Sequence, residues 1–219
     1  ATAILCRDRW AWVFTMTEAA LDIPLELRTV LDRHAGRLDA ELVERAFRFS
    51  AQAHRGQKRM SGEEFVSHSI AVAIILADLL PDSTSIAAAL LHDVVEDSDV
   101  GTDDVAQEFG TEVAALVDGL TKISHLTFRS SAEEQVENYR KLLISIARDA
   151  RVIIIKLADR LHTMRTLEHL NPERRSRIAT ETREIYAPLA HRFGMAEVKA
   201  ELEDLAFRFL EPDDYAALS

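Results

Sequence analysis

Residues 151–170 read RVIIIKLADRLHTMRTLEHL and decide whether the protein contains a buried sheet. The run of β-branched residues at 152–155 would suit a buried strand. Apolar residues then recur at Leu157, Leu161, Met164 and Leu167, the three- and four-residue spacing of one helix face. Because this spacing continues directly from the β-branched run, we predict one buried helix here.

The same helical spacing dominates the chain from Pro24 onward. Glycine and proline number only 7 and 5 of 219 residues, which disfavours turn-rich β architectures. Asp39, either Ser83 or Ser85, and Thr102 are expected to cap helices. Loops are expected at 56–68 and 126–134, and the fold class is therefore all-α. The predicted helices span 25–36, 39–56, 69–80, 83–97, 102–109, 111–124, 136–149, 151–170, 174–195 and 196–212.

Composition limits the surroundings and the partners of the protein. Net charge is −11, which disfavours binding to a nucleic-acid backbone. The single cysteine, Cys6, excludes an internal disulfide and fits a reducing cytoplasm. Residues 1–15 are apolar in patches, but charged residues interrupt them well before the roughly 18 residues of a membrane span. We expect residues 1–16 to be an upstream extension or a cloning remnant, and 17–219 to form one domain.

The string HDVVED at residues 92–97 carries the chemistry. On one continuous helix, His92 would share a face with Glu96, and Asp93 would share one with Asp97. Acidic residues at a helix C-terminus oppose the helix dipole, so this cluster calls for a compensating cation. A divalent metal ion would supply that charge. The alternative is a solvated acidic helix end that carries an incidental histidine.

Two residues elsewhere favour the metal interpretation. His68 directly precedes an apolar helix, and Asp159 lies within the apolar segment IIIKLADRLHTM, where an unpaired carboxylate would be costly. Arg160 is a poor partner for Asp159 because adjacent helix residues do not face one another. A ligand set of nitrogen and oxygen atoms without thiolate suits manganese or iron better than structural zinc. The candidate metal ligands are His68, His92, Asp93 and Asp159.

Four ordered segments resemble the N-terminal hydrolase domain of RelA/SpoT homologues, within the HD-domain metal phosphohydrolases. They are GQKRMSGEEFVSHSI, LLHDVVEDS, KLADRLHTMRTL and EIYAPLAHRFGM, and the resemblance extends from about residue 40 to 215. It implies an HD-domain helical bundle. It also implies Mn²⁺-dependent hydrolysis of guanosine tetraphosphate or pentaphosphate at the 3′ position, which releases pyrophosphate and GDP or GTP in the stringent response.

The resemblance also assigns roles to individual residues. It implies the same four metal ligands, and it places Glu96 and Asp97 around the attacking water. It places Arg59 against the nucleotide, and Thr163 and Thr166 follow Asp159 at helical spacing, so they could meet the nucleoside. Family members commonly have Asn in place of Thr163 and a second basic residue in place of Met60, which leaves substrate preference open.

An acidic protein that binds phosphates needs local cations, and the candidates are Lys58, Arg59, Arg140 and Lys141. Two other functions stay open: an HD phosphohydrolase of another phosphorylated nucleotide, and a non-catalytic nucleotide-binding regulatory domain. The intact His92-Asp93 pair argues against the second. The resemblance further implies a synthetase domain that follows the hydrolase domain in long members, with this chain truncated before it.

Overall fold

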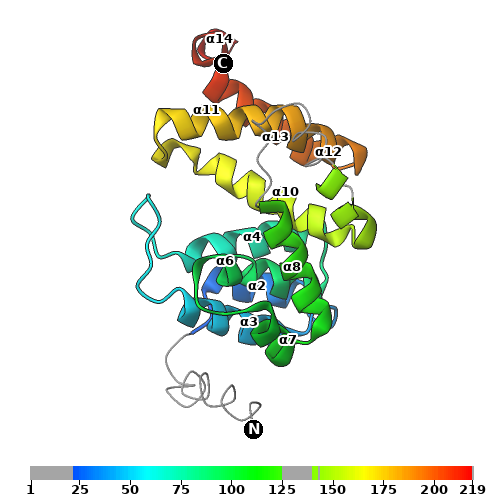
Figure 1. Cartoon of the computed structure of the whole chain (residues 1–219). Coiled ribbons are helices and arrows are strands. Elements are labelled where there is room, and N and C mark those ends of the chain that lie inside the picture. The colour runs from blue at the N-terminus through cyan, green and yellow to red at the C-terminus, as the bar shows by residue number, and fades with distance from the viewer. Residues whose placement is uncertain (1–21, 125–139, 143, 219) are drawn as a thin grey trace.

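The computed structural model describes residues 22–124, 140–142 and 144–218 (Figure 1). The predicted extension at 1–16 and the predicted loop at 126–134 lie outside these residues. Within them the fold is helical, with further helical stretches at 140–142 and 144–148, and the only β pairing is an isolated bridge between Lys58 and Glu64. The elements are α2 (Leu25–Arg33), α3 (Ala40–Ala53), α4 (Val66–Leu79), α5 (Ser83–Leu91), α6 (Val94–Asp97), α7 (Thr102–Phe109), α8 (Thr111–Ser124), α10 (Arg151–Arg165), the 3₁₀ turn η1 (Leu167–His169), α11 (Pro172–Glu181), the π-helical turn η2 (Thr182–Tyr186), α12 (Ala187–Arg192), α13 (Ala196–Leu210) and α14 (Pro212–Leu218).

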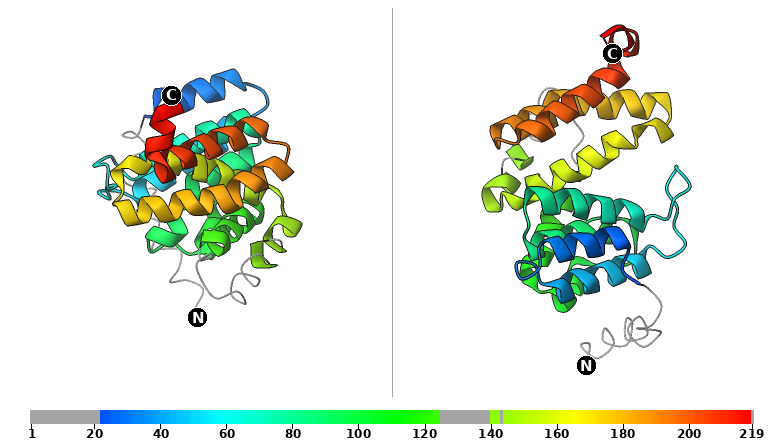
Figure 2. Two further views of the ribbon diagram at one scale, coloured as in Figure 1. Left: turned by 90° about the horizontal axis from the view of Figure 1, so that it is seen from above. Right: turned by 180° about the vertical axis from the view of Figure 1, so that it is seen from behind.

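Helix α10 lies between two groups of helices. On one side it packs against α4, α5 and α8, and on the other against α13 and η2. The two further views show the same arrangement, with α11 to α14 gathered on the far side of α10 from α2 to α8 (Figure 2). Residues 151–165 are thus helical as predicted, and their apolar residues face both groups.

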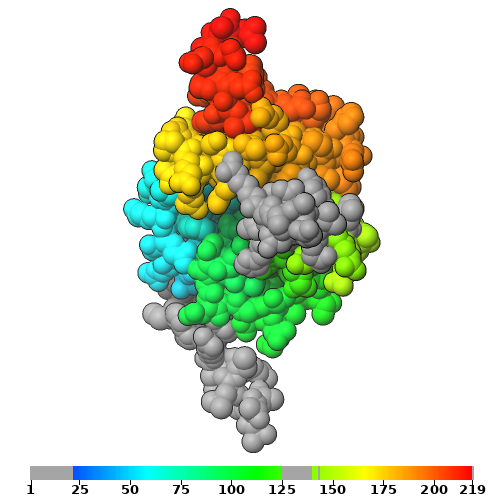
Figure 3. Space-filling model, turned by 45° about the horizontal axis from the view of Figure 1, so that its top comes forward, coloured from blue at the N-terminus to red at the C-terminus, as the bar shows by residue number. Residues whose placement is uncertain are grey.

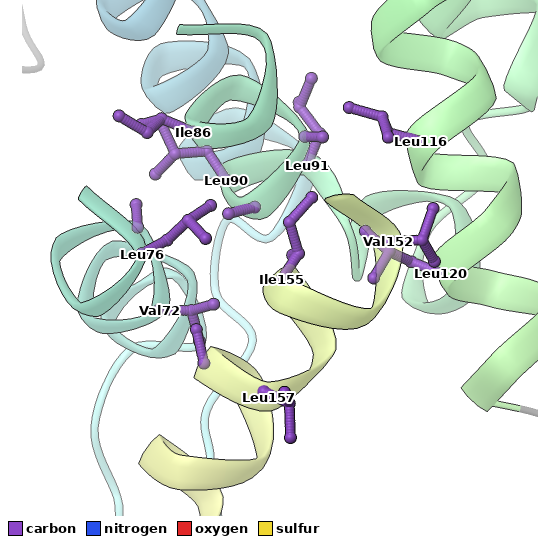
Figure 4. Close-up of a cluster of buried hydrophobic side chains, with 14 of the residues drawn as sticks. Val72, Leu76, Ile86, Leu90, Leu91, Leu116, Leu120, Val152, Ile155 and Leu157 are labelled. Carbon is purple, nitrogen blue, oxygen red and sulfur yellow. The ribbon is translucent and has the colours of Figure 1, made fainter. Parts of the chain in front are cut away.

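The core forms where α4, α5, α8 and α10 meet. Helix α5 is buried on nearly every side because STSIAAALL presents apolar side chains all round. Figure 4 shows Leu116 and Leu120 of α8 lying near Val152 and Ile155 of α10. A β-carbon at Gly119 would lie 2.9 Å from Val152 Cγ2, so the glycine permits this close approach.

Helix ends partly follow the sequence predictions. Asp39 caps α3 as expected, since its carboxylate accepts from the Leu42 N–H at 3.1 Å. The predicted caps of α5 and α7 are wrong. Asp82, one residue before Ser83, accepts from the Ser85 N–H and caps α5. The N-cap of α7 is Gly101, whose own N–H donates to Asp104.

The helix predicted over 83–97 is interrupted at the His-Asp pair. Helix α5 ends at Leu91, His92 and Asp93 form a turn, and α6 starts at Val94. Asp93 is therefore the N-cap of a new short helix, and the acidic residues Glu96 and Asp97 end this short helix and not the continuous helix that was predicted. The break lets His92 and Asp93 point to one site while the apolar faces of both segments stay buried.

The segment between α3 and α4 is a loop, as predicted. Gln57 and Phe65 are joined by a backbone hydrogen bond of 3.0 Å, so the two ends of the loop lie together. Gly62 at its tip has a φ of 91°, which glycine adopts without strain. In the part of the chain that the structure covers, the helices are too short or too polar to cross a membrane.

Candidate metal centre and adjoining pocket

Three side chains from separate helices form a cluster that could hold a metal ion. His68 comes from the first turn of α4, His92 directly follows α5, and Asp159 lies in the middle of α10. One ligand atom from each lies within 4.8 Å of the others, and all three residues are buried. His68 Nε2 is 3.1 Å from Asp159 Oδ1.

Asp93 lies at the open side of this cluster. Its carboxylate oxygens are 3.1 Å from His92 Nε2 and 3.8 Å from His68 Nε2, and it also lines the adjoining pocket. The four residues predicted as ligands are therefore brought together, with Asp93 slightly outside the tighter group of three. This arrangement leaves one side of the cluster open to a ligand.

The hydrogen bonding of His92 fits a metal ligand. Its Nδ1 lies 2.7 Å from the Ala89 carbonyl oxygen, which can only accept, so Nδ1 carries the proton. Its Nε2 is buried and makes no hydrogen bond, although it faces the carboxylates of the cluster. A buried nitrogen lone pair among carboxylates is a favourable position for a divalent cation.

His68 is oriented by His162, which was not among the candidate site residues. His68 Nδ1 is 2.7 Å from Nδ1 of His162 on α10, while His68 Nε2 faces the carboxylates. Burial, together with the nearby His68 and Arg59, lowers the pKa of His162 to about 4. Neutral His162 can therefore accept the Nδ1 proton of His68 and leave the Nε2 lone pair of His68 free for a metal.

We expect His162→Ala to weaken Mn²⁺ binding about 10- to 100-fold, the usual cost of losing the partner of a ligating histidine. Calorimetric titration with Mn²⁺ measures this directly. His191→Ala is the matched control, since this exposed histidine lies on α12 and is not among the residues that line the pocket. Equal Mn²⁺ affinity in the His162 variant and the wild type would contradict the orienting role.

The partner of Asp159 is Lys156, which the sequence analysis did not identify. Lys156 Nζ lies 2.6 Å from Asp159 Oδ2. Burial opposes charge on Asp159, but the Lys156 ammonium and the His68 hydrogen bond hold its pKa well below the usual range. Arg160 points elsewhere, as expected, and lies over the Tyr186 ring and 3.5 Å from Glu181. The i, i+3 spacing of Lys156 and Asp159 was the signal that could have revealed the pair.

Glu96 and Asp97 lie on α6, immediately after the His-Asp turn, and both are exposed. The surrounding protein partly desolvates both carboxylates and raises their pKa values, and Asp93 adds to this effect at each. Gln57 donates a hydrogen bond of 2.9 Å to the Asp97 carbonyl oxygen, which joins α6 to the loop before α4. Asp97 keeps the predicted one-turn relation to Asp93, since its N–H donates to the Asp93 carbonyl oxygen at 2.9 Å, whereas His92 lies outside α6.

A pocket of about 290 Å³ opens beside the cluster. Arg59, Thr163 and Thr166, which were predicted to contact the nucleotide, line it, and so does Lys58, one of the candidate cations. Lys141 is exposed on the helical stretch 140–142 and is not among the lining residues. In the space-filling view the cyan loop adjoins the yellow segment that follows α10 (Figure 3). The pocket has further lining residues that were not predicted to belong to a binding site. They are Ser61, Phe65, His169, Leu170 and Arg174.

The chain is similar to known proteins in both sequence and structure. The family described as HD domain matches residues 46–196. A probable guanosine-3′,5′-bis(diphosphate) 3′-pyrophosphohydrolase of Synechocystis is 52% identical over 174 residues, which are 80% of this chain and 23% of that protein. The bifunctional (p)ppGpp synthase/hydrolase SpoT of Escherichia coli is 49% identical over 176 residues, 80% of this chain and 25% of its own length.

One solved structure is also similar, with a TM-score of 0.55 and 28% identity over 77% of this chain and 95% of the other. Its title describes a metazoan ortholog of SpoT that hydrolyses ppGpp. The resemblance to RelA/SpoT hydrolase domains is therefore confirmed, as is the helical fold class. The chain spans about a quarter of the length of the curated relatives it matches.

Proposed function

This chain belongs to the HD domain family, and from that membership we propose that it hydrolyses guanosine tetraphosphate or pentaphosphate at the 3′ position with Mn²⁺ as its metal. The products would be pyrophosphate and GDP or GTP. The names of the curated relatives support this substrate. We place the reaction in the cytoplasm, in keeping with a chain that has a single cysteine.

The pocket carries this proposal, because it joins a histidine–carboxylate cluster to unpaired positive charge. Arg59 Nη1 is buried and makes no hydrogen bond. Arg174 lines the same pocket, as does Lys58, whose Nζ lies 3.8 Å from Glu64 Oε1, in a chain of net charge −11. A substrate with several phosphates would supply the missing acceptors and balance these charges.

The reaction adds water across one phosphorus–oxygen bond. The water oxygen bonds to the phosphorus attached to the ribose 3′ oxygen, the bond from that phosphorus to the ribose breaks, and the ribose oxygen takes up a proton. A divalent ion held by His68, His92, Asp93 and Asp159 would supply Lewis acidity. Glu96 and Asp97 would orient the water and accept its proton, a contribution of about 10²- to 10⁴-fold. Arg59 would bind the phosphates, and Thr163 and Thr166 would contact the nucleoside.

The experiment that tests the proposal is product analysis of the 219-residue chain with guanosine tetraphosphate and Mn²⁺. We expect GDP and pyrophosphate in equal amounts, and neither product after the metal is chelated. Readdition of Mn²⁺ should restore the reaction. A chain that binds Mn²⁺ and nucleotide but releases no pyrophosphate would overturn the proposal and favour a binding-only domain. If the chain hydrolysed a different phosphorylated nucleotide and not guanosine tetraphosphate, the result would favour an HD phosphohydrolase with another substrate.

Arg174 should contribute to substrate binding and not to the chemical step. It is exposed at the start of α11, its guanidinium lies 3.8 Å from Met60 Sδ, and the described residues give it no carboxylate partner. We expect Arg174→Ala to raise KM about ten-fold with little change in kcat, since a uniform binding contact is lost. Steady-state kinetics with Arg177→Ala, an exposed arginine of the same helix outside the pocket, provides the control. A fall in kcat with unchanged KM would contradict this assignment.

A further inference from the structure

The short helix that carries Glu96 and Asp97 is held at its end by a residue from another part of the chain. Helix α6 has only four residues, too few for a helix to be stable by itself. The carbonyl oxygen of Asp97, its last residue, has no further helical turn to accept from, as at every helix C-terminus. The side-chain amide of Gln57 donates to this oxygen at 2.9 Å. Gln57 therefore fixes the end of α6 on which Asp97 lies.

Gln57 is itself held firmly by the main chain around it. Its N–H donates to the His54 carbonyl oxygen at 2.9 Å, and its own carbonyl oxygen accepts from the Phe65 N–H at 3.0 Å. The rings of His54 and Phe65 stack with their centroids 4.6 Å apart, which joins the end of α3 to the start of α4. The loop between them carries Arg59 into the pocket. Gln57 thus lies where this loop meets the helix that carries the acids.

The hydrogen bonds of the Gln57 side chain run in one direction. The Asp97 carbonyl oxygen can only accept, so Gln57 turns its Nε2 to that oxygen and its Oε1 to His54 Nδ1, 2.9 Å away. Because Oε1 can also only accept, His54 Nδ1 carries the proton. His54 Nε2 is then the unprotonated nitrogen, and it is buried and makes no hydrogen bond. Two hydrogen bonds in series therefore lead from His54 through Gln57 to Asp97.

We propose that His54 and Gln57 are positioning residues for hydrolysis. His54 orients the amide of Gln57, and this amide holds Asp97 and the end of α6 beside the metal cluster. Neither His54 nor Gln57 lines the pocket, so both act through α6 and not through contact with the substrate. The inference rests on the proposed function, because Asp97 is there assigned to the attacking water. It does not depend on which phosphorylated nucleotide is bound.

The first test removes the amide from the 219-residue chain. Gln57→Met keeps the length of the side chain and the two main-chain hydrogen bonds of residue 57, but removes the donor to Asp97. We expect kcat to fall about three- to ten-fold, the usual weight of one hydrogen bond, while KM and the Kd for Mn²⁺ stay within about two-fold of wild type. Gln52→Met is the matched control, because Gln52 is a half-buried glutamine of α3 whose side chain makes no hydrogen bond to another described residue.

A double-mutant cycle tests whether His54 acts through Gln57. His54→Phe keeps an aromatic ring against Phe65 but removes the Nδ1 donor. It should lower kcat by no more than Gln57→Met does. Adding His54→Phe to Gln57→Met should cause no further loss of kcat, because the partner that His54 orients is already gone. Losses of kcat that multiply in the double variant would overturn the series of two hydrogen bonds.

Two NMR measurements need neither substrate nor metal. Nitrogen shifts of the wild type in alkaline buffer should place the proton of neutral His54 on Nδ1, and a proton on Nε2 would overturn the proposal without any substitution. The Asp97 N–H, which donates to the Asp93 carbonyl oxygen inside α6, reports on the helix itself. Its hydrogen exchange should be at least about three-fold faster in Gln57→Met than in the wild type and in Gln52→Met. Equal exchange rates would show that Gln57 does not hold α6.

The outcomes separate this proposal from the proposed function. A wild type that releases no pyrophosphate counts against the proposed function, while hydrogen exchange still decides whether Gln57 holds α6. An active wild type whose Gln57→Met variant keeps full kcat counts against the positioning role alone. A higher KM with unchanged kcat would also overturn that role, since it would make Gln57 a support of the substrate loop. Parallel losses of kcat and Mn²⁺ affinity would overturn it by making Gln57 a support of the metal cluster.

Discussion

Asp159→Ala is expected to abolish hydrolysis and also to destabilise the protein. The activity loss, at least about 10³-fold, follows from the removal of a proposed metal ligand that faces His68 Nε2 at 3.1 Å. The stability loss has a separate cause, because the substitution leaves the ammonium of Lys156 buried without its carboxylate. Breaking a buried ion pair from one side costs about 3–5 kcal/mol in the free energy of unfolding. Urea unfolding in metal-free buffer measures it.

The double variant Asp159→Ala/Lys156→Met separates these two effects. Replacing both members of a buried ion pair with apolar groups is often neutral or stabilising, so most of the unfolding free energy should return. Activity should not return, because the metal ligand is still missing. If the double variant had the same low free energy of unfolding as Asp159→Ala, the unpaired charge of Lys156 would not be the cause of the instability. If it recovered activity, Asp159 would not be a metal ligand.

Glu96→Gln is expected to lower kcat by about 10²- to 10⁴-fold without weakening Mn²⁺ binding, because it removes a proton acceptor and no metal ligand. The substitution keeps the size of the side chain but replaces one acceptor oxygen with an NH₂ donor. Partial desolvation raises the pKa of Glu96, so in the wild type the acid limb of the kcat profile should lie above the usual glutamate range. Asp99→Asn, an exposed carboxylate three residues further along, is the control and should keep the wild-type kcat.

Steady-state kinetics combined with Mn²⁺ calorimetry distinguishes the roles of Glu96 and Asp97. A Glu96→Gln variant with full activity would exclude Glu96 as the base and leave Asp97 as the candidate. A variant that lost activity in proportion to Mn²⁺ affinity would show that Glu96 supports the metal and not the water. Loss of kcat alone is the result that the proposed function requires.

The residue types and the local spacing predicted most of the helices. Asp159 in an apolar segment and His68 ahead of an apolar helix were recognised as unusual before their distance was known. The exact helix ends were predicted less well, since Asp82 and Ser83 are both good caps and the chain direction at that point depends on how α5 enters the core. Lys156 was missed although its spacing to Asp159 on one helix was visible.

Other features had no signal in the sequence. His68 and His162 are 94 residues apart along the chain, and their contact exists only because α4 packs on α10. The pocket is likewise shared between the loop before α4 and the segment from α10 to α11, so neither Arg174 nor His169 could be placed there in advance. Lys141, chosen for its charge alone, lies outside the pocket lining.

The sequence by itself determined the helical class, the buried face of α10 and the identity of the four candidate metal ligands. Each of these depends on neighbours within a few residues along the chain, where side-chain spacing follows directly from backbone geometry. Only the tertiary structure decided that the helix ends at Leu91, so that His92 and Asp93 turn into the cluster. Packing between helices also set the distances among the ligands and their partners, because those distances depend on how α4, α5, α8 and α10 meet in the core.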